Sequence, residues 1–135
     1  MSRILGIDYG DRRIGIALSD PLCIIAKPLT VIDRKITTDH FTKISDIILN
    51  NQVNSVVVGL PLTMKGKKSK QTEIVLSFIN KLKEILKIPV ITIDERLSSI
   101  AAKKSLQEQA IKIRYNKGLI DETAAAIFLQ EYLDS

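Results

Sequence analysis

Residues on which many active sites depend are scarce in this sequence. Its 135 residues include one cysteine, Cys23, one histidine, His40, and no tryptophan. A lone cysteine cannot form an internal disulfide, which agrees with a reducing compartment, and we expect Cys23 to be a buried small hydrophobe. Ser-His-Asp and Cys-His catalysis would both need His40, which falls in an amphipathic helical pattern and which we expect to be exposed to solvent. No Cys/His grouping has the spacing of a zinc site.

Long apolar runs and aromatic residues are scarce as well. No stretch approaches the ~20 apolar residues that span a bilayer, and the apolar start of the chain breaks at Asp8, so it lacks the core of a secretory signal. Aromatic residues make up 4% of the chain, too few for the interleaved platform of a dedicated single-strand binder. We therefore expect a cytoplasmic, soluble protein with no membrane partner.

Positive charge, by contrast, is in excess. Lysine and arginine number 20 against 15 aspartate and glutamate, which gives a net charge of +5. Such a balance favours polyanionic partners such as nucleic acid. The hydrophobic content of 45% is that of a globular protein, and the length suits a single domain spanning residues 1–135.

The periodicity of apolar residues predicts strands first and alternating helices and strands afterwards. We expect strands at 3–9, 14–18, 23–32, 55–58 and 90–93, and helices from about 38, across 74–86, across 97–107 and from about 121, with a basic, turn-like segment at 111–118. Pro28 assigns the third strand to an edge, and Thr38 or Asp39 could cap the first helix. A hairpin meander followed by crossover units predicts an α/β fold with a mixed sheet covered by helices.

Asp8 is the first residue that suggests chemistry. It follows Ile4 and Gly6 on one face of the first strand, so its carboxylate ends a strand expected to be central, where an unpaired charge is costly. A metal ion would compensate that charge. A lysine, an arginine or backbone donors from the turn at Gly10 would also do so.

Two further acidic sites come from distant parts of the chain. Glu95 and its neighbour Asp94 follow the fifth strand, and ligands of open α/β sheets bind beyond the carboxyl ends of strands; either acid could instead pair with Arg96 or favour a helix N-terminus. Asp121, beside Glu122, could be an N-cap.

If the final helix packs next to the first strand, Asp8, Glu95 and Asp121 converge. Carboxylate clusters suit Mg²⁺ or Mn²⁺, and two such ions ~3.5–4 Å apart can activate water and stabilise the leaving oxygen of a phosphodiester. That chemistry needs no histidine.

A lysine-rich loop at 62–70 is the densest positive patch in the chain. It carries Lys65, Lys67, Lys68 and Lys70 and leaves the same expected sheet edge as the acids. Such a charge run is usually a solvated loop, but here contact with phosphates is a second interpretation. Basic residues that could extend the patch or bind nucleic acid are Arg12, Arg13, Arg96, Lys112, Arg114 and Lys117.

Four ordered motifs give the chain a resemblance to a known family. These are Gly6-Ile7-Asp8-Tyr9-Gly10 with Arg13-Ile14-Gly15-Ile16-Ala17 and Ser19-Asp20, Val58-Gly59-Leu60-Pro61 with Gly66, Asp94-Glu95-Arg96-Leu97-Ser98-Ser99, and Asp121 before Ala124-Ala125. Over nearly its whole length the chain resembles the YqgF/RuvX family of the ribonuclease H-like superfamily. The resemblance implies a five-stranded mixed sheet of order 3-2-1-4-5 with the first three strands antiparallel, and it implies that Asp8, Glu95 and Asp121 are metal-binding catalytic acids.

The resemblance also implies a nuclease, with two competing substrates. One is the 5′ end of the small-subunit ribosomal RNA precursor, and the other is the four-way DNA junction; an acidic centre beside a basic rim recognises the phosphate backbone in both. This chain departs from the family in Glu122, which could replace or crowd the third ligand, and in its more basic loop. A monomer is preferred, although a homodimer would suit symmetric junction cleavage.

Two other classes remain as alternatives. Actin-like and sugar-kinase phosphotransferases use a similar first hairpin to hold phosphates, but they generally need two such lobes to enclose a nucleotide. A non-catalytic nucleic-acid-binding module with the same fold is the other, although all three acids are present.

Overall fold

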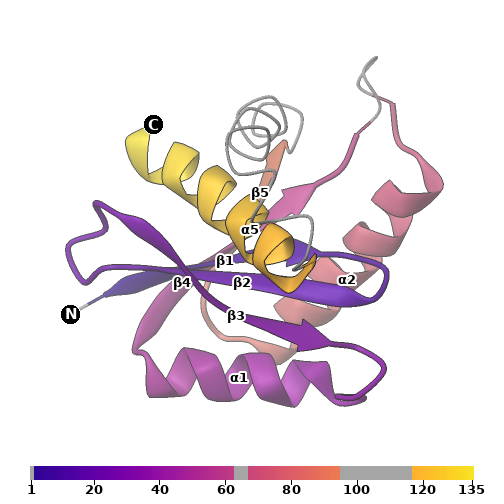
Figure 1. Cartoon of the computed structure of the whole chain (residues 1–135), viewed down its shortest axis with the longest axis horizontal. Helices are drawn as coiled ribbons and strands as arrows, with labels where there is room; N and C mark the ends of the chain where they lie inside the picture. Colours follow the sequence, from indigo (N-terminus) through magenta and orange to yellow (C-terminus); the bar gives the residue numbers. More distant parts are fainter. Residues whose placement is uncertain (1, 63–66, 95–116) are drawn as a thin grey trace.

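A five-stranded mixed sheet organises the molecule (Figure 1). The computed structural model describes residues 2–62, 67–94 and 117–135, and in the last helix it describes side chains from Ala124 onward. The elements are β1 (Arg3–Tyr9), β2 (Arg13–Ser19), β3 (Ala26–Asp33), α1 (His40–Asn50), β4 (Val53–Leu60), α2 (Lys70–Ile85), β5 (Val90–Asp94) and α5 (Lys117–Asp134). The strand order is β3-β2-β1-β4-β5, with β1, β2 and β3 antiparallel and with β4 parallel to both β1 and β5, as expected.

The first difference from expectation is the start of β3. The Asp20 carboxylate accepts hydrogen bonds from the backbone N–H groups of Ile24 (2.7 Å) and Ile25 (2.8 Å), and Cys23 has a positive φ of 58°. These contacts fold the segment into a turn, so the strand begins at Ala26. Cys23 is consequently half-buried, and the expectation of a buried cysteine was wrong.

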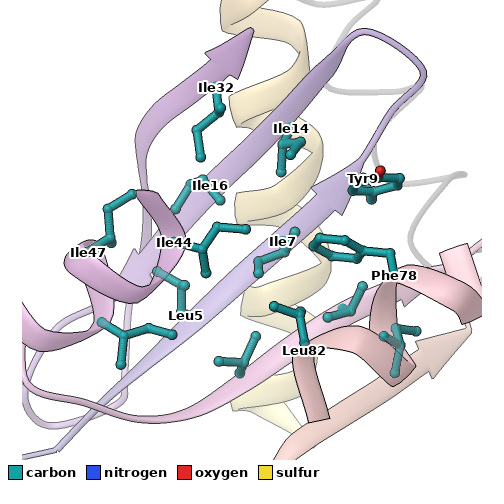
Figure 2. Close-up of a cluster of buried hydrophobic side chains, with 14 of the residues drawn as sticks. Leu5, Ile7, Tyr9, Ile14, Ile16, Ile32, Ile44, Ile47, Phe78 and Leu82 are labelled. Atoms are coloured by element: carbon teal, nitrogen blue, oxygen red, sulfur yellow. The ribbon is translucent and has the colours of Figure 1, made fainter. Parts of the chain in front are cut away.

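One face of the sheet carries a large aliphatic core beneath α1 and α2. Strand residues alternate between the faces, and Leu5, Ile7 and Tyr9 of β1 all point into this core (Figure 2). Ile44 from α1 and Leu82 from α2 are almost completely buried against them. Asp39 caps α1 by accepting a hydrogen bond from the Thr42 N–H, one of the two predicted caps.

The opposite face is covered by α5, and glycines lie where the helix crosses β1 and β4. A Cβ atom on Gly6 would lie 2.9 Å from Leu129 Cβ and 3.2 Å from the Ala125 carbonyl oxygen, so the helix backbone lies directly on this strand. A Cβ on Gly59 would meet the Phe128 ring at 3.0 Å. Glycine at these positions therefore allows α5 to approach the sheet closely.

The start of α5 corrects a second expectation. The helix begins at Lys117, four residues before Asp121, so the turn predicted to reach Gly118 is wrong at that end. Asp121 is inside the helix and is not its N-cap. The helix predicted at 97–107 lies outside the described residues. Within the described part of the chain, no helix is both long and apolar enough to cross a bilayer.

Candidate functional site

One edge of the sheet gathers the chain segments that carry the predicted site. β1, β4 and β5 are parallel, so their last residues, Tyr9, Leu60 and Asp94, meet at the same edge. The hairpin between β1 and β2 turns at this edge, and β3 also ends there because it is antiparallel to β2. The segment that bears the lysines leaves from the end of β4.

Asp8 lies at this edge on the α5 face, because Gly6, two residues earlier, packs against α5. Its side chain is partly exposed. Its Cα partner in β2 is Gly15, and since Ile7 pairs with Val58, Gly59 is the next residue of β4 on its other side. Asp8 is thus flanked by two glycines, and the ring of Phe128 from α5 packs over Gly59.

The alternation of β5 separates the two acids that follow it. Ile91 and Ile93 pack on the α5 side, whereas Val90 packs against the core under α1 and α2. Asp94 is therefore on the face opposite Asp8. Glu95 lies outside the described residues.

The direction of α5 decides which of its ends is near Asp8. The Gln130 side chain accepts a hydrogen bond from the Ala26 N–H (2.8 Å), at the edge where β1 begins. Ala125 lies over Gly6 in the middle of β1, so earlier residues of α5 approach the end of β1. Asp121 is one turn before Ala125, and its side chain, like that of Glu122, is outside the described part. No group of three metal-ligating side chains occurs among the side chains that are described.

The lysine-rich segment is closed at its base by Thr72, which sequence reasoning missed. The buried Thr72 hydroxyl donates a hydrogen bond to the Pro61 carbonyl and accepts one from the Ser69 N–H at 2.9 Å. Ser69 in turn caps α2, and the two residues form a capping box. The spacing Ser69-x-x-Thr72 was the available signal, with threonine in the place usually taken by glutamate or glutamine.

The predicted basic residues are only partly covered by the structure. Lys67, Lys68 and Lys70 are exposed at the base of the loop, and Arg12 is exposed on the β1–β2 turn. Arg13 is half-buried at the start of β2, and Lys117 begins α5. Those outside the described residues are Lys65, Arg96, Lys112 and Arg114.

Arg34, which directly follows β3, is a second residue that sequence reasoning missed. Its Nη1 donates hydrogen bonds to the carbonyl oxygens of Gly10 (3.0 Å) and Asp11 (2.7 Å), and its guanidinium lies 4.5 Å from the centre of the Tyr9 ring. The hairpin turn is therefore tied to the end of β3. Arg12, on the same turn, pairs with Asp33 at 3.5 Å.

His40 was expected to be exposed, and this was wrong. Its ring lies 4.5 Å from that of Phe41 and 6.0 Å from that of Tyr9, and its Nε2 is buried without a hydrogen-bond partner in the described part of the protein. Burial, and then the charge of Arg34, lowers the pKa of His40. Burial also raises the pKa of Tyr9, which Arg34 partly offsets.

Comparison with known proteins identifies the family. The model of the RuvX family, described as Holliday junction resolvase, matches residues 2–135. The chain belongs to the RuvX family. A relative from Roseiflexus sp. (strain RS-1) is 41% identical over 98% of this chain and 94% of its own length, and one from Desulforamulus reducens is 44% identical over 98% and 97%. Both relatives carry the name "Putative pre-16S rRNA nuclease".

Solved structures support the RuvX fold independently of close sequence similarity. RuvC of Thermus thermophilus in complex with a Holliday junction substrate superposes with a TM-score of 0.59 at 14% identity, over 100% of this chain and 98% of that one. The fowlpox virus Holliday junction resolvase gives a TM-score of 0.54 at 13% identity, over 98% and 97%. At these identities the likeness concerns the fold, which is that of the ribonuclease H-like resolvases.

Proposed function

We propose that the protein is a divalent-metal-dependent endonuclease that hydrolyses phosphodiester bonds at the 5′ end of pre-16S ribosomal RNA. Asp8, Glu95 and Asp121 are its catalytic acids. The observation that carries this proposal is the position of Asp8. It ends the central strand on the face covered by α5, between two glycines, at the edge where the parallel strands end.

The spacing of α5 and β1 supports a meeting of Asp8 and Asp121. Asp121 precedes Ala125 by four residues, about 6 Å along a helix, and Asp8 follows Gly6 by two residues, about 6.6 Å along a strand. Since Ala125 lies over Gly6 and the residues of α5 before Ala125 lie towards the end of β1, we assign both acids to the same place.

Glu95 enters the proposal through its motif, Asp94-Glu95-Arg96, which begins at the end of β5, at the sheet edge where Asp8 lies. Asp94 is on the face opposite Asp8 and is left out of the site. Glu122 is one residue from Asp121, about 100° around the helix, and is also left out.

The donor set suits Mg²⁺ or Mn²⁺, which prefer carboxylate oxygens. Asp8, Glu95 and Asp121 would hold the ion. When bound, such ions generate a nucleophilic water and stabilise the leaving oxygen of the phosphodiester. The protein's own part is to fix the acids on rigid elements and to hold the strand being cut with Arg12, Arg13, Lys65, Lys67, Lys68, Lys70, Arg96 and Arg114.

We favour RNA as the substrate because the relatives that cover nearly the whole chain are named for pre-16S rRNA. The second candidate is the Holliday junction, which the family description names. RNA processing places the protein in the cytoplasm, and a monomer suffices for it, whereas symmetric junction cleavage needs two active sites.

The test is cleavage of a pre-16S 5′ leader RNA and of a four-way DNA junction, with Mg²⁺, with Mn²⁺ and with chelator. We expect metal-dependent cleavage of the RNA, and loss of a direct ligand in Asp8→Asn should lower the rate by about a hundredfold or more, since loss of an outer partner alone can cost that much. Asp46→Asn, the same chemical change on the exposed side of α1, is the matched control.

Undiminished cleavage by Asp8→Asn would exclude this site. Cleavage of the junction but not of the RNA would replace the first substrate with the second. In cells depleted of the protein, 5′-extended 16S precursor should accumulate, and normal 16S ends would contradict the RNA assignment.

A further inference from the structure

A pocket of about 390 Å³ opens at the tip of the β1–β2 hairpin, on the α1 side of the sheet edge. Three segments of the chain form it: the hairpin turn, the residues after β3 and the start of α1. Its lining residues are Asp11, Arg12, Arg34, Lys35, Thr38 and His40. Three cationic side chains and one carboxylate therefore surround a single hollow.

Arg34 is fixed in this pocket before any ligand arrives. Its Nη1 is held by the carbonyls of Gly10 and Asp11, and its guanidinium lies over the Tyr9 ring. The N–H groups on Nε and Nη2 have no acceptor among the residues that the structure describes. A guanidinium held in this way loses little conformational freedom when it binds an oxyanion through its remaining donors.

The other cations differ in how far they are already neutralised. Arg12 pairs with Asp33, and the Asp33 carboxylate also accepts a hydrogen bond from the Lys35 N–H at 2.9 Å. The Lys35 side chain is exposed and forms no ion pair or hydrogen bond with another described side chain. Lys35 and Arg34 therefore supply most of the charge that a ligand would meet.

Thr38 and His40 complete the lining on the α1 side. The Nε2 atom of His40 is itself buried and has no partner in the described part. The Asp39 carboxylate accepts hydrogen bonds from the N–H and the hydroxyl group of Thr42. Asp39 is not among the residues that line the pocket. The pocket thus presents hydrogen-bond donors from several elements, and it suits a small oxyanion that two donors hold at once.

We propose that this pocket binds a backbone phosphate of the nucleic-acid substrate, a few nucleotides from the scissile bond. The inference rests on the proposed nuclease function. Asp11 follows Asp8 by three residues, at most about 10 Å of extended chain, a distance that a few nucleotides of one strand can span. A strand cut beside Asp8 on the α5 face therefore passes over the hairpin tip and reaches Arg34 and Lys35 on the other side.

The test is to measure binding of the 5′ leader RNA by fluorescence anisotropy, in the presence of chelator and over a range of salt concentrations. Lys35→Glu should weaken binding about tenfold, because a like charge replaces a phosphate contact, and should flatten the salt dependence by up to about 0.9 in log–log slope. Lys27→Glu changes the net charge equally at the opposite end of β3 and should leave affinity nearly unchanged.

His40 gives a second measurement that does not depend on any substitution. As the only histidine in the chain, it has a single set of imidazole proton signals in NMR spectra. We expect these signals to shift when the RNA is added, and the pKa of His40 to rise as an anion stabilises the imidazolium. Inorganic phosphate alone should shift the same signals at higher concentration, which would identify the phosphate group as what the pocket takes.

The outcomes separate the two proposals. If the wild-type protein binds the RNA but Lys35→Glu matches it in affinity and slope and the His40 signals do not move, the pocket is not part of the interface while the nuclease function stands. If the wild-type protein binds and cleaves neither RNA nor DNA junction, the proposed function fails and this inference fails with it.

Discussion

The two faces of the sheet differ in how closely helices approach the strands. Under α1 and α2, β1 contributes Leu5, Ile7 and Tyr9 to a core of large aliphatic and aromatic side chains. Under α5, the same strand contributes Gly6, and its neighbours contribute Ala17, Val57 and Gly59. The first face therefore holds the larger buried cluster, and the other brings a helix backbone close to the strand that carries Asp8.

This difference suggests a division of labour. A large core stabilises the fold in proportion to the apolar surface that it removes from water, and its side chains can adjust to one another. A helix packed on glycine has no such freedom, because its position is fixed by backbone contacts. We therefore expect the first face to set stability and the second to set the geometry of the acids.

Truncating the large core should give the largest loss of stability. Leu82 is 1% exposed in α2, and Leu82→Ala should lower the free energy of unfolding by about 2–5 kcal/mol, from lost burial and the cavity left behind. Urea denaturation would measure this. The folded fraction should still cleave at close to the wild-type rate, and a large loss of specific activity at low temperature would mean that the two faces are not independent.

Filling the space under α5 should reduce catalysis more than it reduces stability. Gly6→Ala puts a methyl group 2.9 Å from Leu129 Cβ, so the helix must move by a few tenths of an ångström, at an overpacking cost of about 1–3 kcal/mol. Catalysis should fall by about tenfold or more, since displacements near 1 Å can cost a hundredfold.

Gly59→Ala is the matched control for this substitution. Its methyl group would meet the edge of the Phe128 ring, a side chain that can shift, so both losses should be smaller. Equal activity in Gly6→Ala and wild type would remove the argument that the helix position sets the site.

Sequence reasoning was most reliable where hydrophobic periodicity is long and local. The strands β1, β2, β4 and β5 lie within about two residues of their predicted bounds, and the resemblance supplied the strand order that periodicity cannot give. The start of β3 was missed because a single carboxylate, Asp20, captures backbone N–H groups that a strand would otherwise use.

The errors around the site have different causes. His40 shares a helical face with the buried Ile44 and Ile47, so its burial could have been predicted from the spacing alone. The contacts of Arg34 could not, because they join two turns brought together only by the folded sheet. The early start of α5 was hidden by Gly118, which resembles a turn signal but is tolerated within a helix.

A substitution at the base of the lysine-rich loop tests whether the sheet face under α1 and α2 also contributes to the site. Thr72→Val removes the hydroxyl that joins Pro61 to Ser69, and should cost about 1–2 kcal/mol of stability because buried polar groups lose their partner. If the lysines bind phosphates without being held in one position, RNA binding should weaken only slightly. Thr42→Val, at the equivalent position of α1, is the control for a lost cap contact, and equal binding losses in both would argue against any role of the loop.

The smallest expected effect is a dependence of stability on pH that arises from His40, on the sheet face under α1 and α2. Burial lowers the pKa of His40, so folding favours the neutral imidazole. Its contribution is complete above the unfolded pKa of about 6.5 and is lost as the pH falls through that value towards the lower folded pKa. The denaturation midpoint should therefore decrease between pH 7 and pH 5, and less so in His40→Phe, which keeps an aromatic ring beside Tyr9. An NMR titration of this single imidazole with an apparent pKa above 6.5 in the free protein would contradict the burial and require a charge partner for His40 outside the described residues.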